Sequence, residues 1–194
     1  MAKTHNFSFK TDIRERMNFL KNTGSLREVG ALTMSSKYVV RHVLKLLPHK
    51  FNTVIEYGPG SGVMTEAILK RLSSRGKLLA VEANAKFTKT LNRLKDPRLR
   101  VLHCKAQHLA SELIREFSRA DAVLSSIPFT FLTSADRLRV VSDAYKMLAS
   151  GGIFVVFHQY TPLMFYPLHK TFRSVAIKFE PRNVFPCFIL IAKK

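Results

Sequence analysis

Residues 54–62 of this 194-residue chain read Val-Ile-Glu-Tyr-Gly-Pro-Gly-Ser-Gly. The run from Thr53 to Tyr57 is β-branched and apolar enough to predict a buried strand, and the three glycines after it predict a tight turn. From Val63 to Leu72 the apolar residues fall at helical spacing, so we expect a helix after the turn. This order places backbone N–H groups and a helix N-terminus at the carboxyl end of a parallel strand. Nucleotides bind to α/β folds at such a position.

The glycine spacing and two acidic residues narrow the type of ligand. A dinucleotide-binding loop would read G-x-G-x-x-G, whereas Gly58, Gly60 and Gly62 follow the pattern G-x-G-x-G. Glu56 precedes the turn, and Glu82 ends the next apolar run. Together these features resemble the class I S-adenosylmethionine-dependent methyltransferases. The simpler alternative is an ordinary βα turn with a surface glutamate at a strand end.

The resemblance implies a fold, a cofactor and a set of contacts. The expected fold is α/β, a Rossmann-like class I methyltransferase fold with a doubly wound seven-stranded sheet and a C-terminal antiparallel hairpin. S-adenosylmethionine would be the cofactor and S-adenosylhomocysteine the product. The E-x-G-x-G-x-G loop would wrap the amino-acid part of the cofactor, and Glu82 would accept hydrogen bonds from the ribose hydroxyls.

The expected adenine contact departs from the family pattern. Members of the family often carry an Asp after the third strand, which bonds the adenine amino group. The matching run here is Cys104-Lys105-Ala106-Gln107, which has no acid, so we expect Gln107 or a backbone N–H to make this contact. The cofactor-binding residues that we expect are Glu56, Tyr57, Gly58, Pro59, Gly60, Gly62, Glu82, Ala83, Ala106, Gln107, Ser125, Ser35 and Ser36.

Predicted strands and helices alternate along the rest of the chain, in agreement with this fold. A helix with an apolar stripe from Val39 to Leu47 is expected to begin after Ser35 or Ser36, whose alternative role is capping alone. Pro48 ends this helix. Further strands are expected near 77–82, 99–102, 122–124 and 153–157, helices near 86–94, 109–117 and 134–148 (the last ended by Gly151-Gly152), and a hairpin near 174–179 and 185–191.

The N-terminal stretch is basic and amphipathic. Ile13, Met17 and Leu20 lie at i, i+4 and i+7, which predicts a short helix with one apolar face. This face would either pack on the edge of the domain or lie on anionic lipid, and periodicity does not choose between the two. We expect one structural domain in two parts: residues 1–50 as a helical segment, cofactor lid and membrane contact, and residues 51–194 as the S-adenosylmethionine-binding core.

The charge indicates a polyanionic partner. Lys and Arg together number 32 against 13 Asp and Glu, a formal net charge of +19. Nucleic acid and an anionic membrane surface both fit such a charge. The two cysteines form no C-x-x-C motif, so we expect neither a disulfide framework nor a metal site. There is no signal-peptide pattern, and the apolar runs are too short to span a bilayer, which predicts a cytoplasmic protein or one bound peripherally to the cytoplasmic face of the membrane.

One candidate for the methyl acceptor is RNA. The run Ser126-Ile127-Pro128-Phe129 is similar to the N-[IL]-P-[YF] loop of ribosomal RNA adenine dimethyltransferases. There an Asn side chain and a backbone carbonyl hold the exocyclic amine, and the aromatic ring stacks on the flipped base. Ser126 replaces that Asn, and no RNA-binding appendage follows the core.

A second resemblance covers nearly the whole length and favours a lipid acceptor. Bacterial phospholipid N-methyltransferases have similar residues at Phe19-Leu20, Val29-Gly30-Ala31, Ser35-Ser36, 56–62, 81–84, 125–129 and 151–160. (Met34 stands where that family usually has Pro.) The resemblance implies stepwise methylation of phosphatidylethanolamine towards phosphatidylcholine by a peripheral membrane enzyme. The oligomeric state stays open.

The expected catalytic residues are Tyr160, His158, Phe129 and Ser126. An amine acceptor must lose a proton, and His158 and Tyr160 end the fifth predicted strand, where a group that orients the amine or accepts its proton is needed. The alternatives are a structural role for His158 and a lid over the cofactor for Tyr160. A further alternative is a catalytically silent, basic nucleotide-binding adaptor. This alternative stays open because Lys105 stands where members of the family often have an acid.

Overall fold

The computed structural model describes residues 36–159, 161–183 and 186–194. Its centre is a seven-stranded sheet with the order β3-β2-β1-β4-β5-β7-β6. The strands are β1 (Phe51–Tyr57), β2 (Leu72–Glu82), β3 (Leu99–His103), β4 (Ala120–Ser125), β5 (Leu148–Gln159), β6 (Ser174–Glu180) and β7 (Cys187–Lys193). Strands β1 to β5 pair in parallel, and β7 runs antiparallel to both β5 and β6. The predicted fold class, with its C-terminal hairpin, is confirmed.

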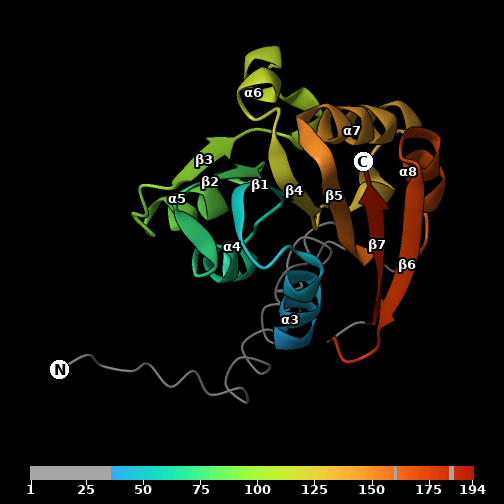
Figure 1. The fold of residues 1–194 in the computed structure, drawn as a ribbon, viewed down its shortest axis with the longest axis horizontal. Coiled ribbons are helices and arrows are strands. Elements are labelled where there is room, and N and C mark those ends of the chain that lie inside the picture. The colour runs from blue at the N-terminus through green and yellow to red at the C-terminus, as the bar shows by residue number, and fades with distance from the viewer. Residues whose placement is uncertain (1–35, 160, 184–185) are drawn as a thin grey trace. The chain divides into compact units, whose positions relative to one another are not determined.

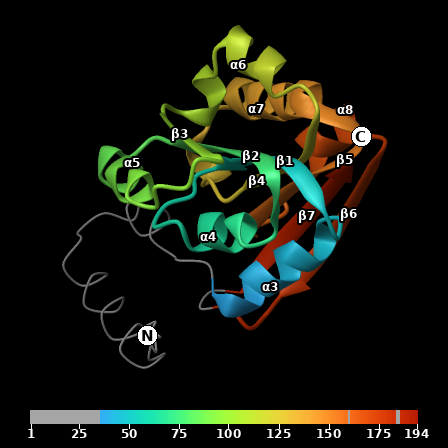
Figure 2. The ribbon, with the colours of Figure 1, turned by 60° about the vertical axis from the view of Figure 1, so that its left-hand side comes forward.

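Helices cover both faces of the sheet (Figure 1). Figures 1 and 2 show α6, α7 and α8 over one face and α3 and α4 over the other. The helices are α3 (Lys37–Leu46), α4 (Val63–Leu69), α5 (Ala85–Asn92), α6 (Ser111–Glu116), α7 (Ser134–Met147) and α8 (Phe165–Thr171), with single 3-10 turns η1 (Ala106–His108) and η2 (Phe129–Phe131). Because both faces are covered, the central strands are apolar in both directions. In β1, Ile55 and Tyr57 pack under α7, while Val54 packs on the side of α3 and α4.

Two strand starts differ from the prediction, and both depend on glycines. The helix expected to reach Leu72 ends at Leu69, and β2 begins at Leu72 and not near residue 77. The pairing of β1 with β2 is irregular between Leu72 and Lys77. A Cβ at Gly76 would lie 2.5 Å from Leu72 Cγ and 2.9 Å from the carbonyl oxygen of Asn52, so only glycine fits at this irregularity.

The fifth strand likewise begins earlier than predicted, at Leu148. Gly151 and Gly152, expected to stop the preceding helix, lie inside β5. A Cβ on Gly152 would lie 3.0 Å from the carbonyl oxygen of Ala120 in β4. These glycines therefore serve an irregular pairing of β5 with β4.

Helix α8 was not predicted. Its sequence contains Phe165, Tyr166 and Pro167, residues with weak helix preference. Pro167 lies in the first turn, where its missing N–H costs no helical hydrogen bond. Leu168 and the neighbouring Phe172 are buried under this helix. Tertiary packing on the sheet thus outweighs a weak local preference.

The topology brings the functional loops to one edge of the sheet. The carboxyl ends of β1 to β5 all lie at this edge, because these strands are parallel. Strand β6 also ends here, since it is antiparallel to β7, which is antiparallel to β5. The expected division into residues 1–50 and 51–194 stays a prediction, and residues 1–35 lie outside the described part of the chain.

Candidate functional site

The glycine loop after β1 has the backbone that its sequence demands. Gly58, Gly60 and Gly62 have φ values of 73°, 56° and 91°, a region that residues with a Cβ rarely adopt. The N–H of Gly58 donates to the carbonyl oxygen of Val81 at 2.9 Å, which fastens the loop to β2. A Cβ on Gly60 would meet no atom within 4 Å, whereas one on Gly58 would lie 2.7 Å from Ile127 Cγ2. The loop is therefore packed tightly against Ile127 at Gly58, and it has free space beside it at Gly60.

Glu82, the last residue of β2, holds the other side of this opening. Its Oε2 accepts a hydrogen bond from the Gly60 N–H at 2.9 Å, and its Oε1 accepts one from the Asn84 N–H at 2.8 Å. A carboxylate has about four lone-pair positions, so acceptor capacity remains for hydroxyl donors. Next in the chain, the carbonyl oxygen of the exposed Ala83 accepts from His103 Nε2 at 3.1 Å. Asn84 and His103 were not predicted as site residues. Asn84 follows Glu82 by two residues in the chain, and the pairing of Glu82 with His103 in the sheet brings His103 here.

Glu56 lies beneath the same loop and is fully buried. The Thr65 hydroxyl of α4 donates to Glu56 Oε2 at 2.7 Å, which ties β1 to the helix after the loop. Burial raises the pKa of Glu56 to about 7; the Thr65 hydrogen bond opposes this rise, and the charge of Glu82 adds to it. Thr65 has no sequence signal that marks it for this contact. Glu56 thus carries a proton at mildly acid pH and a buried negative charge at alkaline pH.

Two buried hydroxyls at this edge have no hydrogen-bond partner within the described residues. They belong to Tyr57 and Ser125, which are neighbours in the pairing of β1 with β4. Burial, together with the nearby Asp143 and Cys104, raises the pKa of Tyr57 well above its usual range, so its hydroxyl stays protonated. Orphaned polar atoms, the space over Gly60 and the acceptor capacity of Glu82 fit a polar ligand that carries hydroxyls.

The segment after β3 is the expected adenine side. Lys105 precedes η1 and is exposed, Ala106 is buried, and Gln107 is half-buried. All three follow the end of β3, which pairs with the end of β2 at Glu82. The adenine contact of Gln107 stays a prediction. Pro59, in the glycine loop, is buried and accepts a hydrogen bond from the Gly62 N–H at 3.0 Å.

The loop after β4 is fastened to the glycine loop. The Ser126 N–H donates to the carbonyl oxygen of Tyr57 at 3.0 Å, and the Ser126 hydroxyl donates to the carbonyl oxygen of Gly58 at 2.6 Å. The ring of Phe129 is fully buried in the core under α7, and its carbonyl oxygen accepts from Arg137 Nε at 2.9 Å. Ser126 and Phe129 therefore fix the shape of this loop from the protein side. Their direct roles with an acceptor stay predictions.

The remaining predicted residues are placed only in part. Ser36 is the N-cap of α3: its Oγ accepts from the Val39 N–H at 3.4 Å, and its own N–H donates to Asn183 Oδ1 at 3.3 Å. This is the capping role that was the alternative for Ser36. Ser35, Tyr160 and the side chain of His158 lie outside the described residues. Within the described ranges, no group of three or more His, Cys, Asp or Glu residues is arranged to hold a metal ion.

The open parallel sheet, the glycine loop and the carboxylate at the end of β2 define an α/β methyltransferase fold and site. Residues 54–152, just over half of the chain, match the family described as Methyltransferase domain. The chain therefore belongs to this family. A comparison with curated protein sequences gave no match.

Solved structures of methyltransferases share the fold. The N-methyltransferase NodS from Bradyrhizobium japonicum WM9, in complex with S-adenosyl-L-homocysteine, is 12% identical with a TM-score of 0.66, over 82% of this chain and 88% of that chain. The precorrin-6y C5,15-methyltransferase from Geobacter metallireducens GS-15 is 15% identical with a TM-score of 0.64, over 84% and 91%.

A third structure covers this chain completely. It is the 1,6-didemethyltoxoflavin-N1-methyltransferase from Burkholderia thailandensis, with bound 1,6-didemethyltoxoflavin and S-adenosylhomocysteine. It is 13% identical, with a TM-score of 0.62 over 100% of this chain and 93% of that chain. The family and the fit of the site confirm the predicted cofactor, S-adenosylmethionine, and its product, S-adenosylhomocysteine. The chain is an S-adenosylmethionine-dependent methyltransferase. No helix in the described ranges is both long and apolar enough to cross a membrane.

Proposed function

We propose that this protein is an N-methyltransferase that methylates the amino head group of phosphatidylethanolamine at a membrane surface, towards phosphatidylcholine. The sequence resemblance to phospholipid N-methyltransferases supports this, because it runs from Phe19 through the glycine loop to Tyr160. The similar structures include two N-methyltransferases, whose fold this chain shares. The proposed division at residue 50 gives the N-terminal segment the role of cofactor lid and membrane contact.

The observation that carries the choice of lipid over RNA is the state of residues 126–129. An adenine methyltransferase needs a side chain that holds the base amine and an aromatic ring exposed for stacking. Here the Ser126 hydroxyl donates a hydrogen bond to the Gly58 carbonyl oxygen, and the Phe129 ring is fully buried. Neither group is presented in the way that a flipped adenine requires.

The chemistry asks little of the protein beyond position and proton removal. S-adenosylmethionine, when bound, supplies an electrophilic methyl group on a sulfonium. The amine lone pair forms the new N–C bond while the C–S bond breaks and its electron pair stays on sulfur. A primary ammonium with a pKa near 10.4 must first lose a proton, which costs about 4–5 kcal/mol at neutral pH. The hydrogen bonds of Ser126 to Tyr57 and Gly58 hold the acceptor side of the site against the cofactor loop. The proposed proton acceptors are His158 and Tyr160.

The test is methyl transfer from labelled S-adenosylmethionine to anionic liposomes that contain phosphatidylethanolamine, with ribosomal RNA in a parallel tube. We expect label in the lipid fraction, lost in Glu82→Ala because that change removes the carboxylate beside Gly60. Glu66→Ala, at an exposed position of α4, is the matched control and should retain activity. Label in RNA alone would overturn the proposal. Cofactor binding with label in neither tube would support the silent adaptor instead.

A further inference from the structure

Large exposed hydrophobic side chains concentrate at one edge of the sheet. Within the described residues, three of the five such side chains lie on α8 and β6: Tyr166 is 68% exposed, Ile177 42% and Phe179 53%. Single exposed hydrophobic residues are ordinary, but a group on neighbouring elements indicates an interaction surface. Strand β6 is the edge strand, because it pairs only with β7 among the described strands.

Ile177 and Phe179 lie on the same face of β6 as Val175, because side chains two residues apart in a strand point the same way. Val175 packs on the core beneath α8. Beyond the end of α8, Ile177 and Phe179 continue this face towards the edge of the sheet that carries the site. The ring of Phe179 contacts that of Phe188 in β7, with 5.4 Å between centroids. The apolar strip is therefore built on rigid strands.

Basic side chains flank this strip on both faces of β6: by alternation along the chain Arg173 lies on the face of Ile177 and Phe179, and Lys178 on the opposite face. Lys170, Arg173 and Lys178 are all exposed, and Lys170 Nζ lies 5.7 Å from the centroid of the Tyr166 ring. The only acid between residues 165 and 182 is Glu180, which is buried, ion-paired with Arg182 at 2.8 Å and hydrogen-bonded to His42 at 3.0 Å. The exposed charge that α8 and β6 themselves contribute is therefore entirely positive.

We propose that this surface, which we call the β6 edge (Tyr166, Lys170, Arg173, Ile177, Lys178 and Phe179), docks on an anionic lipid bilayer. Exposed apolar side chains ringed by lysine and arginine match the boundary between lipid head groups and acyl chains. Each basic residue near such a surface contributes about 1 kcal/mol. This inference rests on the proposed function, because an enzyme that methylates a lipid must bind to the membrane that contains it. All residues of the β6 edge belong to α8, β6 and the segment between them.

Charge and side-chain type favour lipid over the other occupants. A second copy of this chain would bring the same positive charges against each other, and lysine on an edge strand opposes strand-to-strand association. Ile177 offers no aromatic face to a nucleotide base. The interior of a bilayer accepts aliphatic and aromatic side chains alike.

Docking at the β6 edge would also orient the site. Phe179 pairs with Phe188, and Phe188 pairs with Gln159 at the carboxyl end of β5. The end of β5, where the proposed proton acceptors follow, is thus two strands away from the exposed Phe179. With the β6 edge docked, the head group of a membrane lipid would therefore lie near the carboxyl end of β5, while its acyl chains stay in the bilayer.

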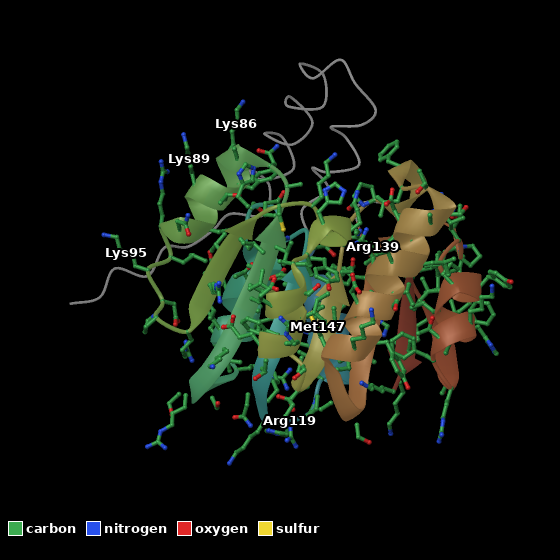
Figure 3. The ribbon with its side chains drawn as sticks, turned by 90° about the horizontal axis from the view of Figure 1, so that it is seen from above. Lys86, Lys89, Lys95, Arg119, Arg139 and Met147 are labelled. Carbon is green, nitrogen blue, oxygen red and sulfur yellow. The ribbon has the colours of Figure 1, made fainter. Side chains whose placement is uncertain are left out.

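The opposite edge of the sheet supplies a matched control. Lys86 and Lys89 point outward from α5, which contacts β2 and β3 at the far side of the sheet from α8 (Figures 1 and 3). The described part of α5 is basic and exposes no large hydrophobic side chain. If charge alone attracted the membrane, α5 and the β6 edge would contribute equally.

The experiment is co-sedimentation of the full chain with vesicles of phosphatidylglycerol and phosphatidylcholine, without phosphatidylethanolamine. We expect wild-type protein to bind and the double variant Ile177→Ser, Phe179→Ser to bind at least tenfold more weakly, because two large side chains no longer enter the lipid. Leu138→Ser, at an exposed position of α7, is the apolar control and should bind like the wild type.

A charge pair tests the same surface without altering the strip. Arg173→Glu, Lys178→Glu should weaken vesicle binding by more than tenfold, and Lys86→Glu, Lys89→Glu by clearly less. Circular dichroism and thermal unfolding check that each variant folds. Because these vesicles contain no amine substrate, binding here with no methylation of phosphatidylethanolamine elsewhere would leave the docking surface standing and overturn the proposed function.

Three results would overturn the docking surface. One is wild-type protein that does not sediment with anionic vesicles. The second is equal loss of binding from the β6-edge and α5 charge reversals, with Ile177→Ser, Phe179→Ser unaffected. The third is a dimer or an RNA complex that the double serine variant disrupts while vesicle binding persists.

Discussion

Glu56 and Glu180 are equally buried, each 1% exposed, yet their pKa values move in opposite directions. Burial under the cofactor loop raises the pKa of Glu56 to about 7; the hydrogen bond from the Thr65 hydroxyl opposes this rise, and the nearby carboxylate of Glu82 adds to it. Glu180, at the end of β6, accepts hydrogen bonds from Arg182 and His42, and its pKa falls to about 2. Burial raises the pKa of both carboxyl groups; it dominates at Glu56, which has no cationic partner, and the hydrogen bond from Arg182 outweighs it at Glu180.

The opposite pKa shifts distinguish a glutamate with a structural role, Glu180, from one in the candidate binding site, Glu56. Glu180 is fully satisfied by protein: Arg182 donates through Nε at 2.8 Å and Nη2 at 2.9 Å, and His42 donates at 3.0 Å, which ties α3 to β6. No cation within the described residues neutralises Glu56 in this way. A buried carboxyl group without a cationic partner, at the cofactor edge of the sheet, is typical of a binding site.

Removal of the Glu180 carboxylate should have the largest effect on the free energy of unfolding. Glu180→Ala is expected to lower the free energy of unfolding by about 2–4 kcal/mol, because His42 and Arg182 lose their buried partner. Glu112→Ala, which removes an exposed pair with Arg115, should change it by less than about 0.5 kcal/mol. Urea unfolding at pH 7 measures both, and equal effects would contradict the assignment of Glu180 as a clamp.

The two glutamates should respond to pH with opposite signs. The folded pKa of Glu180 lies below its unfolded value of 4.5, so its contribution to stability is present above pH 4.5 and is lost as pH falls towards 2. The folded pKa of Glu56 lies above 4.5, so its contribution is present below pH 4.5 and is lost as pH rises through about 7.

Glu56→Gln should therefore stabilise the protein at pH 8–9 by about 2 kcal/mol and have little effect near pH 4, because glutamine never acquires the buried charge. Unfolding free energies from pH 4 to 9 measure this. A constant difference between variant and wild type across that range would show that the Glu56 pKa is not raised.

The loop above Glu56 can be probed at two glycines with similar backbones and different surroundings. Gly58→Ala should cost about 2 kcal/mol or more, because φ is positive and the new Cβ would meet Ile127 Cγ2 at 2.7 Å. Gly60→Ala has the same backbone strain without a clash and should cost about 1 kcal/mol. Combining Gly58→Ala with Ile127→Ala should cost less than the sum of the two single changes, and strict additivity would contradict the contact.

A small effect on stability, similar to that of Gly60→Ala, is expected at Ser126. Ser126→Ala removes the hydrogen bond to the Gly58 carbonyl oxygen and should cost about 1 kcal/mol. If this bond positions the acceptor loop, kcat should fall while the affinity for S-adenosylhomocysteine changes little. Ser118→Ala, at an exposed loop position, is the control. A fall in cofactor affinity with unchanged kcat would place Ser126 on the cofactor side instead.

The cofactor-binding part of the site, which comprises the glycine loop at residues 58–62 and Glu82, was predictable because its sequence motifs are local. Glycines at positions of positive φ and a carboxylate at a strand end depend on residues adjacent in the chain, so the loop at residues 58–62 and Glu82 could be predicted from spacing. The same holds for the order of strands and helices. The roles of Thr65 and His103 were not predicted, because each bonds a residue that only the fold brings close. The bond of the Asn84 N–H to Glu82, two residues earlier in the chain, is local and was also not predicted.

The acceptor half was less predictable because packing decides it. The identity of Phe129 suggested an exposed stacking ring, but the core under α7 buries it. Helix α8 and the early start of β5 depend on contacts with distant strands, which local preference does not contain.

Local pattern therefore established the fold class, the cofactor loop and the total charge, since periodicity, glycine geometry and composition are properties of the chain itself. Tertiary contacts established which groups carry charge and which face outward. Glu56 and Glu180 are the same residue type and both are buried. Burial without a cationic partner raises the pKa of Glu56, whereas the hydrogen bond from Arg182, helped by His42 of the distant helix α3, outweighs burial and lowers the pKa of Glu180.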